Sequence, residues 1–194
     1  MPTLRDIDHS QGPVSAPLSV MAYASYQCPQ ARQAHRTSQE LRESLGDQLC
    51  FVFRHYPMGE TYPLAQTAAE TAEAAGAQGK FWEMHDKLFA NQDALDEASL
   101  VQYASELNLE MSTFLHEISH SIHTPRIQSD IDSAAQYGVE VSPTFFISVC
   151  HKGNANLVSL VRQILFATLA YGKKNTLPAA EDKREKGSYK QPVG

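Results

Sequence analysis

The sequence predicts an α/β domain from the order of its apolar patterns. Residues 18–23 and 49–53 are apolar runs of strand length, and a helical pattern lies between them. That pattern has Pro29 at its first position and stops at Gly46, which are common first and last signals of a helix. A strand, a helix and a strand at this spacing form a βαβ unit with a parallel pair. The β signal returns only at residues 143–147, so the intervening stretch must be accommodated as an insertion.

That insertion, about residues 62–138, is predicted to be helical throughout because apolar residues recur there at helical spacing. Five stripes are present: Leu64, Ala65, Ala68, Ala69, Ala72 and Ala75; Phe81, Met84, His85, Leu88 and Phe89; Leu100, Ala104 and Leu107; Leu115, Ile118 and Ile122; Ile127, Ile131 and Ala134. A further stripe, residues 157–168, predicts a closing helix that ends at Gly172. We therefore expect a loose lead over residues 1–16, one domain over 17–172, and a disordered charged tail over 173–194.

Composition restricts the class of protein. The chain has 194 residues, 42% hydrophobic and 9% aromatic, which is enough for one globular domain with a sizeable core. A formal charge of −6 without a basic run argues against nucleic acid or an anionic membrane as the main partner. No apolar stretch approaches the ~20 residues of a membrane span, and the first twenty residues carry no signal-peptide core, so the cytoplasm is expected.

Three cysteines, Cys28, Cys50 and Cys150, are an odd and widely spaced set. They match neither a disulfide framework nor a zinc-binding spacing, so we expect reduced thiols, no metal and no cofactor.

Cys28 is the main candidate for chemistry, because it directly precedes the helix that starts at Pro29. A thiol there meets unpaired N–H groups and the positive end of the helix dipole, and both favour the thiolate. Arg32, one turn later, would add a cation. The alternative is an inert, partly buried cysteine, the common fate of a free thiol.

Ser142-Pro143 is the second candidate feature, because proline cannot donate to a sheet ladder and is unusual at the head of an apolar strand. A cis peptide bond would accommodate it and leave backbone groups of Ser142 available to an extended substrate. The alternative is an ordinary proline of an edge strand.

Four separated stretches resemble the DsbA-like branch of the thioredoxin superfamily, over roughly residues 12–172. They are residues 12–29 (GPVSAPLSVMAYASYQCP), 53–57 (FRHYP), 68–91 (AAETAEAAGAQGKFWEMHDKLFAN) and 141–147 (VSPTFFI). The resemblance implies a thioredoxin-like fold with a helical insertion between the second strand and the cis-proline strand. It also implies thiol–disulfide exchange with protein or peptide substrates, with Cys28 as the attacking thiol and Ser142-Pro143 as the loop facing it.

The chain departs from that family at three places. Ala31 stands where relatives usually carry a second, resolving cysteine, and Ala22 where they usually carry a buried acid. Ser148-Val149 replaces the Asn-Gly turn that often follows the last strand. The site Cys28-Pro29-Gln30-Ala31 therefore holds a single sulfur.

No other cysteine of the chain is expected to resolve a mixed disulfide at Cys28. Cys50 begins the second strand, at the far end of the sheet from Cys28, and Cys150 lies down a strand that leads away. A disulfide needs Cα atoms within about 7 Å. We thus expect either monothiol exchange that uses glutathione or another external thiol, or a redox-silent peptide-binding or chaperone-like module. Oligomeric state is left open.

Other suggestive residues are interpreted as structural. His116, Glu117 and His120, followed by His123, spell a metalloprotease pattern, but the helix stripe predicts that the histidines face water. His85 lies on an apolar stripe and is expected to be a core histidine. Arg54 and His55 either add positive potential near the thiol or serve the structure.

Overall fold

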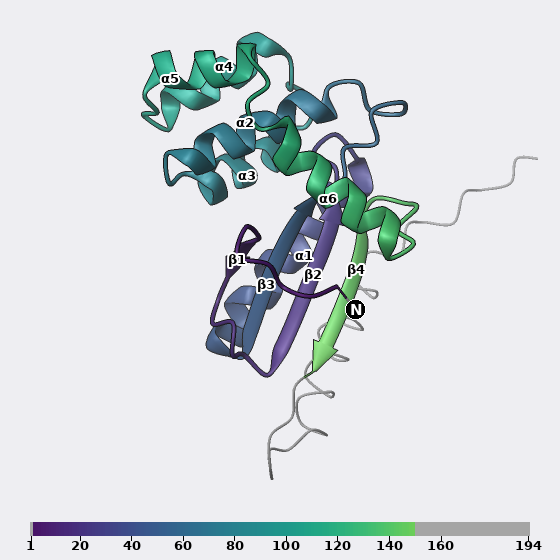
Figure 1. The fold of residues 1–194 in the computed structure, drawn as a ribbon. Coiled ribbons are helices and arrows are strands. Elements are labelled where there is room, and N and C mark those ends of the chain that lie inside the picture. Colours follow the sequence, from purple (N-terminus) through teal and green to yellow (C-terminus); the bar gives the residue numbers. More distant parts are fainter. Residues whose placement is uncertain (1, 150–194) are drawn as a thin grey trace, which may run out of the picture. The chain divides into compact units, whose positions relative to one another are not determined.

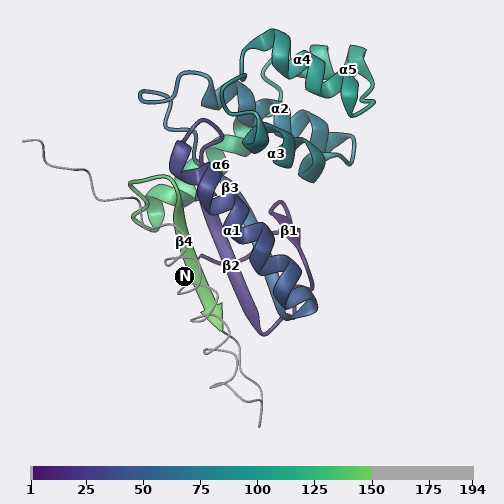
Figure 2. The same cartoon turned by 180° about the vertical axis from the view of Figure 1, so that it is seen from behind.

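A computed structural model of the protein describes residues 2–149, which form one four-stranded sheet with helices around it (Figures 1 and 2). The strands are β1 (His9–Gln11), β2 (Leu18–Ala24), β3 (Leu49–His55) and β4 (Thr144–Val149). Their order is β1-β3-β2-β4, with β2 parallel to β3 and the two outer strands antiparallel to their neighbours. The predicted α/β class and the parallel pair are confirmed.

The two central strands form the buried middle of the domain. The register runs from Leu18 opposite Leu49 to Ala24 opposite His55, and all seven residues of β3 are buried. An apolar strand buried on both faces is what the continuous run in β3 predicts.

Helix α1 (Pro29–Leu45) connects β2 to β3 and lies along one face of the sheet (Figure 2). Pro29 occupies its first position, where a missing N–H removes no helical hydrogen bond. Gly46 ends it with a φ of 49°, a conformation that glycine adopts without steric penalty. A short 3₁₀ turn, η1 (Gly46–Gln48), leads directly into β3.

The insertion between β3 and β4 consists of five helices, as predicted. They are α2 (Ala65–Ala77), α3 (Phe81–Ala90), α4 (Glu97–Glu106), α5 (Met111–Ser119) and α6 (Thr124–Gln136). Figure 1 shows α2 to α5 grouped beyond the carboxyl ends of β2 and β3, and α6 returning toward β4. None of the helices within residues 2–149 is long and apolar enough to cross a membrane.

The predicted buried face of α5 was wrong. Leu115 is 46% exposed and Ile122 is 52% exposed, whereas Phe114 is 1% exposed. The helix ends at Ser119, so Ile122 lies beyond it and cannot continue a stripe. One aromatic side chain, rather than a row of aliphatic ones, anchors this short helix.

The expected loose lead is also corrected, because it contains a strand. β1 pairs with β3, with His9 opposite Phe53 and Gln11 opposite Phe51. Gly12 follows with a φ of 84°, and a Cβ there would collide with the carbonyl oxygen of Leu49. The segment is therefore held tightly against the sheet. Its three polar residues, His-Ser-Gln, give no apolar signal by which sequence reasoning could find a strand.

Arg54 is buried in an ion network that joins this lead to the sheet. Its guanidinium donates to both carboxylate oxygens of Asp8, at 2.9 and 2.7 Å, and to the Tyr23 hydroxyl at 2.7 Å. It also donates to Ser133 Oγ at 2.9 Å and to Thr3 O at 2.6 Å. Of the two roles left open for Arg54, this arrangement supports the structural one.

The network continues into α6 through Asp130, whose side chain is fully buried. Arg5 forms ion pairs with both Asp8 and Asp130, and Arg126 pairs with Asp130 at 2.7 Å. The other oxygen of Asp130 accepts the backbone N–H of His55 at 2.9 Å. The lead, the end of β3 and α6 are thus tied together by charge.

β4 is buried on one side only. Phe145, Ile147 and Val149 are 39%, 57% and 38% exposed, whereas Phe146 between them packs against the core. The predicted closing helix, the tail and Cys150 lie outside the described residues.

Substitution Arg54→Met is expected to lower the free energy of unfolding by about 3–5 kcal/mol, because it leaves a buried carboxylate without its main partner. Chemical denaturation measures this change. Lys80→Met is the control, since it breaks an ion pair whose side chains are 45% and 47% exposed, and it should cost less than about 1 kcal/mol. Similar small losses in both variants would contradict the role given to Arg54.

Candidate functional site

Cys28 lies where β2 gives way to α1, and it is the N-cap residue of that helix. Its carbonyl oxygen accepts the N–H groups of Ala31 at 3.0 Å and Arg32 at 3.2 Å, which closes the first turn. The same oxygen accepts Gln92 Nε2 at 2.9 Å, from the loop after α3. The backbone of the cysteine is therefore held by both the first turn of α1 and the helical insertion.

The sulfur atom of Cys28 lies against the loop before β4. Its Sγ donates to the carbonyl oxygen of Ser142 at 3.2 Å, and the Ser142–Pro143 peptide bond is cis. The Ser142 hydroxyl in turn accepts the backbone N–H of Ser25 at 2.9 Å. Two residues 114 positions apart in the sequence thus meet at one sulfur.

The sulfur is enclosed in this structure. Cys28 is 1% exposed, and Gln30 Oε1, at 3.2 Å from Sγ, is a second acceptor within reach of its single S–H. Gln30 itself is exposed, so the group over the sulfur belongs to a surface side chain. A substrate could reach the thiol only after the Gln30 side chain moves aside.

Tyr62 is a site residue that sequence reasoning missed. A hydrogen bond with Cys28 raises the pKa of the Tyr62 hydroxyl, with smaller contributions from burial and from the charge of Cys28. The phenol therefore stays protonated and can donate to the sulfur. Tyr62 lies in the loop between β3 and α2, where no pattern in the sequence marks it.

Arg32, which was expected to add positive charge near Cys28, is paired with an exposed carboxylate. Its guanidinium donates to Asp93 Oδ2 at 3.1 Å, and that carboxylate is 93% exposed. Its charge remains one turn from the N-cap of α1, but its hydrogen bond does not go to Cys28.

The positions that depart from the family pattern are both buried. Ala31, at the place of the missing resolving cysteine, is 1% exposed in the first turn of α1. Ala22 is 3% exposed in β2, opposite Phe53 on one side and Phe145 on the other. An apolar residue thus occupies the position in β2 at which the family resemblance implies a buried acid.

Cys50 is far from the site, as expected. It pairs with Ser19 near the start of β2, whereas Cys28 follows the end of that strand at Ala24. Five residues of strand at about 3.3 Å each separate the two ends by roughly 16 Å. Burial raises the pKa of the Cys50 thiol, which keeps it protonated and unreactive.

The metalloprotease-like pattern is not assembled as one helical face. His116 and His120 are exposed, with ring centroids 4.2 Å apart, and α5 ends between them at Ser119. His123 instead caps α6 and bonds to Glu117 Oε2 at 2.9 Å. Glu117, the residue that would be the base of such a protease, is thus bonded to a histidine of the same pattern.

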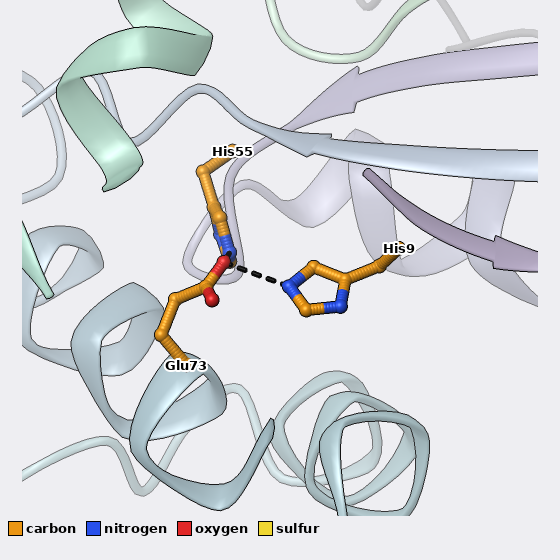
Figure 3. Close-up of side chains that lie close together, drawn as sticks. All are labelled: His9, His55 and Glu73. Atoms are coloured by element: carbon orange, nitrogen blue, oxygen red, sulfur yellow. Dashed lines mark hydrogen bonds and ion pairs between the residues drawn. The ribbon is translucent and has the colours of Figure 1, made fainter. Parts of the chain in front are cut away.

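A separate group of titratable side chains joins β1, β3 and α2 (Figure 3). Glu73 Oε1 is hydrogen-bonded to His9 Nε2 at 2.9 Å and to His55 Nε2 at 2.8 Å. Burial would raise the pKa of Glu73, but the hydrogen bonds and charges of His55 and His9 outweigh it and hold that pKa well below its ordinary value. This contact supports the structural role for His55.

Comparison with known proteins identifies the family of the chain. The sequence profile of the family described as Thioredoxin matches residues 5–158. The chain belongs to the thioredoxin family. Among curated relatives, a Na(+)/H(+) antiporter NhaA 3 of Salinispora tropica is 36% identical over 193 residues, which are 99% of this chain but 29% of that protein. A NhaA 1 antiporter of Mycolicibacterium vanbaalenii is 34% identical over 84% of this chain and 27% of its own length. The chain therefore spans less than a third of these relatives.

Solved structures share its fold at low sequence identity. Alpha-DsbA1 of Wolbachia pipientis has a TM-score of 0.68 at 22% identity, covering 89% of this chain and 96% of that one. A thioredoxin-like oxidoreductase of Silicibacter pomeroyi scores 0.67 at 22% identity, with 87% and 94% covered. BdbD of Bacillus subtilis scores 0.64 at 20% identity, with 83% and 92% covered. The predicted thioredoxin-like fold of DsbA type is confirmed.

Removal of the phenol beside the sulfur should make Cys28 less reactive. In Tyr62→Phe we expect alkylation of Cys28 at neutral pH to slow by roughly two- to tenfold, because a hydrogen bond to the charged form of a group favours that form. Iodoacetamide labelling between pH 5 and 9, followed by mass spectrometry of the Cys28 peptide, measures the rate. Tyr103→Phe is the control. It removes a hydroxyl from a residue of α4, where that hydroxyl donates to Ala94 O at 2.9 Å. Identical rates in all three proteins would contradict the role of Tyr62.

Acid stability should depend on Glu73. Its folded-state pKa is depressed, so its carboxylate stabilises the fold fully above the ordinary value of 4.5, and that contribution is lost as pH falls toward the folded-state pKa. Between pH 5 and pH 2 the free energy of unfolding should therefore fall by about 2 kcal/mol more in the wild type than in Glu73→Gln. Urea denaturation across this range is the measurement. Glu60→Gln, which removes an exposed carboxylate, should follow the wild type, and a Glu73→Gln curve parallel to both would refute the assignment.

Proposed function

We propose that this thioredoxin-family chain exchanges disulfides through Cys28 alone. One observation carries the proposal: Cys28 caps α1 with its Sγ 3.2 Å from Ser142 O, beside the cis bond to Pro143, while Ala31 occupies the place of a second sulfur. A nucleophile is thus held in position, and Cys50, the other cysteine of residues 2–149, lies too far away to finish the exchange.

The reaction balances only with an external thiol. The Cys28 thiolate attacks one sulfur of a protein or peptide disulfide, forms a mixed disulfide, and releases the other sulfur as a thiolate. A second thiolate, from glutathione, the substrate or another protein, then attacks the mixed disulfide and restores Cys28. With a glutathionylated substrate, the substrate thiol is freed first, and glutathione then leaves as its own disulfide. Reshuffling and deglutathionylation fit this scheme better than net oxidation of dithiols.

The surroundings of Cys28 favour the first step. Cys28 lies at the N-terminal end of α1, where the helix dipole favours negative charge. The protonated Tyr62 hydroxyl adds a hydrogen-bond donor. Arg32 contributes positive charge at the same helix end, although its exposed pair with Asp93 weakens that contribution. Arg32 is therefore a minor activator of the Cys28 thiol.

The substrate is expected to lie along the Ser142–Pro143 loop. Phe145 and Ile147 of the following strand are exposed, which offers apolar contacts to a protein or peptide chain. Antiport is no part of the proposal, because this chain corresponds to less than a third of the antiporter relatives.

A second candidate is a redox-silent module that binds peptides and has lost the chemistry. The observation that favours it is the enclosure of Cys28, which is 1% exposed and within hydrogen-bond distance of both Ser142 and Gln30. In that case the loop before β4 would still receive extended segments, but the thiol would be a buried packing group.

Reaction with oxidised glutathione separates the two candidates. For monothiol exchange we expect a glutathione adduct on Cys28 that forms at least about tenfold faster than on the unfolded chain and is removed by reduced glutathione. Mass spectrometry identifies the labelled cysteine. Cys50→Ser should react like the wild type, and Cys28→Ser should not form the fast adduct. Labelling of Cys28 no faster than in the unfolded chain, with no turnover of a glutathionylated peptide, would leave the silent module.

A further inference from the structure

A group of three possible metal ligands lies between α1 and α3, apart from the reactive sulfur. His35 comes from α1, and the adjacent residues His85 and Asp86 come from α3. One ligand atom of each lies within 4.8 Å of the others. Both histidines are buried, at 8% and 1% exposure, whereas the Asp86 side chain is 45% exposed and opens the group to solvent.

The spacing suits a tetrahedral ion. His35 Nε2 and Asp86 Oδ1 are 3.3 Å apart. Two ligand atoms at about 2.0–2.1 Å from a tetrahedral zinc ion are themselves separated by roughly 3.3–3.4 Å. The rings of His35 and His85 have centroids 4.9 Å apart and are inclined by 70°, so they approach from different directions.

His85 presents a buried nitrogen that lacks a partner. Its Nδ1 is 3.0 Å from the Tyr26 hydroxyl, but its Nε2 has no hydrogen bond among the described residues. A buried polar atom without a partner is rare and calls for an explanation. Metal-binding histidines characteristically have their other ring nitrogen held by a hydrogen bond, as Tyr26 does here. In the tautomer whose Nδ1–H donates to the Tyr26 oxygen, Nε2 carries the lone pair that a metal ion needs.

We propose that His35, His85 and Asp86 bind one divalent transition-metal ion of the zinc type, with the fourth position open to water. Two imidazoles and one carboxylate are a donor set that Zn²⁺ accepts. The bound ion would tie α1, which carries Cys28, to α3 of the helical insertion. This site goes beyond the thiol chemistry and does not depend on it.

The neighbouring groups define what the ion must compete with. Arg42 carries a positive charge that interacts with Asp86, so it opposes a cation at this group. Its guanidinium lies over the rings of Phe51 and Trp82, at 5.4 and 5.8 Å from their centroids. Gln39 Nε2 is 3.4 Å from Asp86 Oδ1, too long for a strong hydrogen bond.

The group of His9, His55 and Glu73 is a poorer candidate despite the same kinds of ligand (Figure 3). Both Nε2 atoms there already bond to one carboxylate oxygen, at 2.9 and 2.8 Å. Arg126 Nε lies 3.8 Å from that oxygen and adds a further positive charge. Glu73 Oε1 already has two hydrogen-bond partners, whereas His85 Nε2 has none among the described residues.

Titration of the metal-free full chain, without a histidine tag, tests the site. Cobalt chloride and zinc chloride are the probes, and Cys28→Ser is the background so that the thiol cannot take the ion. We expect one ion per chain, a visible Co²⁺ absorption typical of tetrahedral coordination, and a higher melting temperature with Zn²⁺. Asp86→Asn and His35→Gln should each weaken binding at least about tenfold.

Control variants make the result decisive. His116→Gln with His120→Gln removes the exposed pair on α5 and should leave binding unchanged, and His9→Gln should do the same. Melting curves in EDTA show whether each variant still folds, and Asp86→Asn changes only a half-exposed side chain. No binding in the parent protein would overturn the proposal. So would binding that survives Asp86→Asn and His35→Gln, or that disappears with the α5 pair.

Discussion

The buried guanidinium of Arg54 is the interaction on which the described part of the chain depends. It lies on a central strand, is 1% exposed, and reaches the lead through Asp8 and Thr3 and α6 through Ser133. Removing such a charge from water is costly unless its hydrogen bonds are satisfied, and here they are. The arrangement therefore holds only when the lead, the sheet and α6 are all in place.

The reactive site inherits this rigidity. Asp130, tied to Arg5 in the network, also accepts the N–H of His55 and fixes the carboxyl end of β3. β2 ends beside it, so the turn that presents Cys28 starts from a fixed base. Contacts from Ser142 and Gln92 then orient the cysteine from the loop before β4 and from the insertion. Positioning a single sulfur thus draws on most of the described chain.

The apolar periodicity of the sequence predicts most of the fold. The central strands, α1 and the helical character of the insertion follow from it. The position of Ser142 opposite Cys28 was predicted from the family resemblance instead. What periodicity could not show depends on long-range polar contacts. β1 is polar and short, Tyr62 lies in an unpatterned loop, and Arg32 is drawn to Asp93 across 61 positions. His35 and His85 become neighbours only when α1 packs on α3.

The lead also constrains when folding can finish. Arg5 precedes Asp130 by 125 positions, and Asp8 precedes Arg54 by 46. A ribosome delivers the lead long before α6, so the contact of Arg5 with Asp130 cannot form until most of the chain is made. Contacts between such distant residues form slowly, because a large loop must close first. A nascent chain that stops before α6 therefore lacks Asp130, the carboxylate that binds both Arg5 and the end of β3. The complete ion network forms only after α6 has been made.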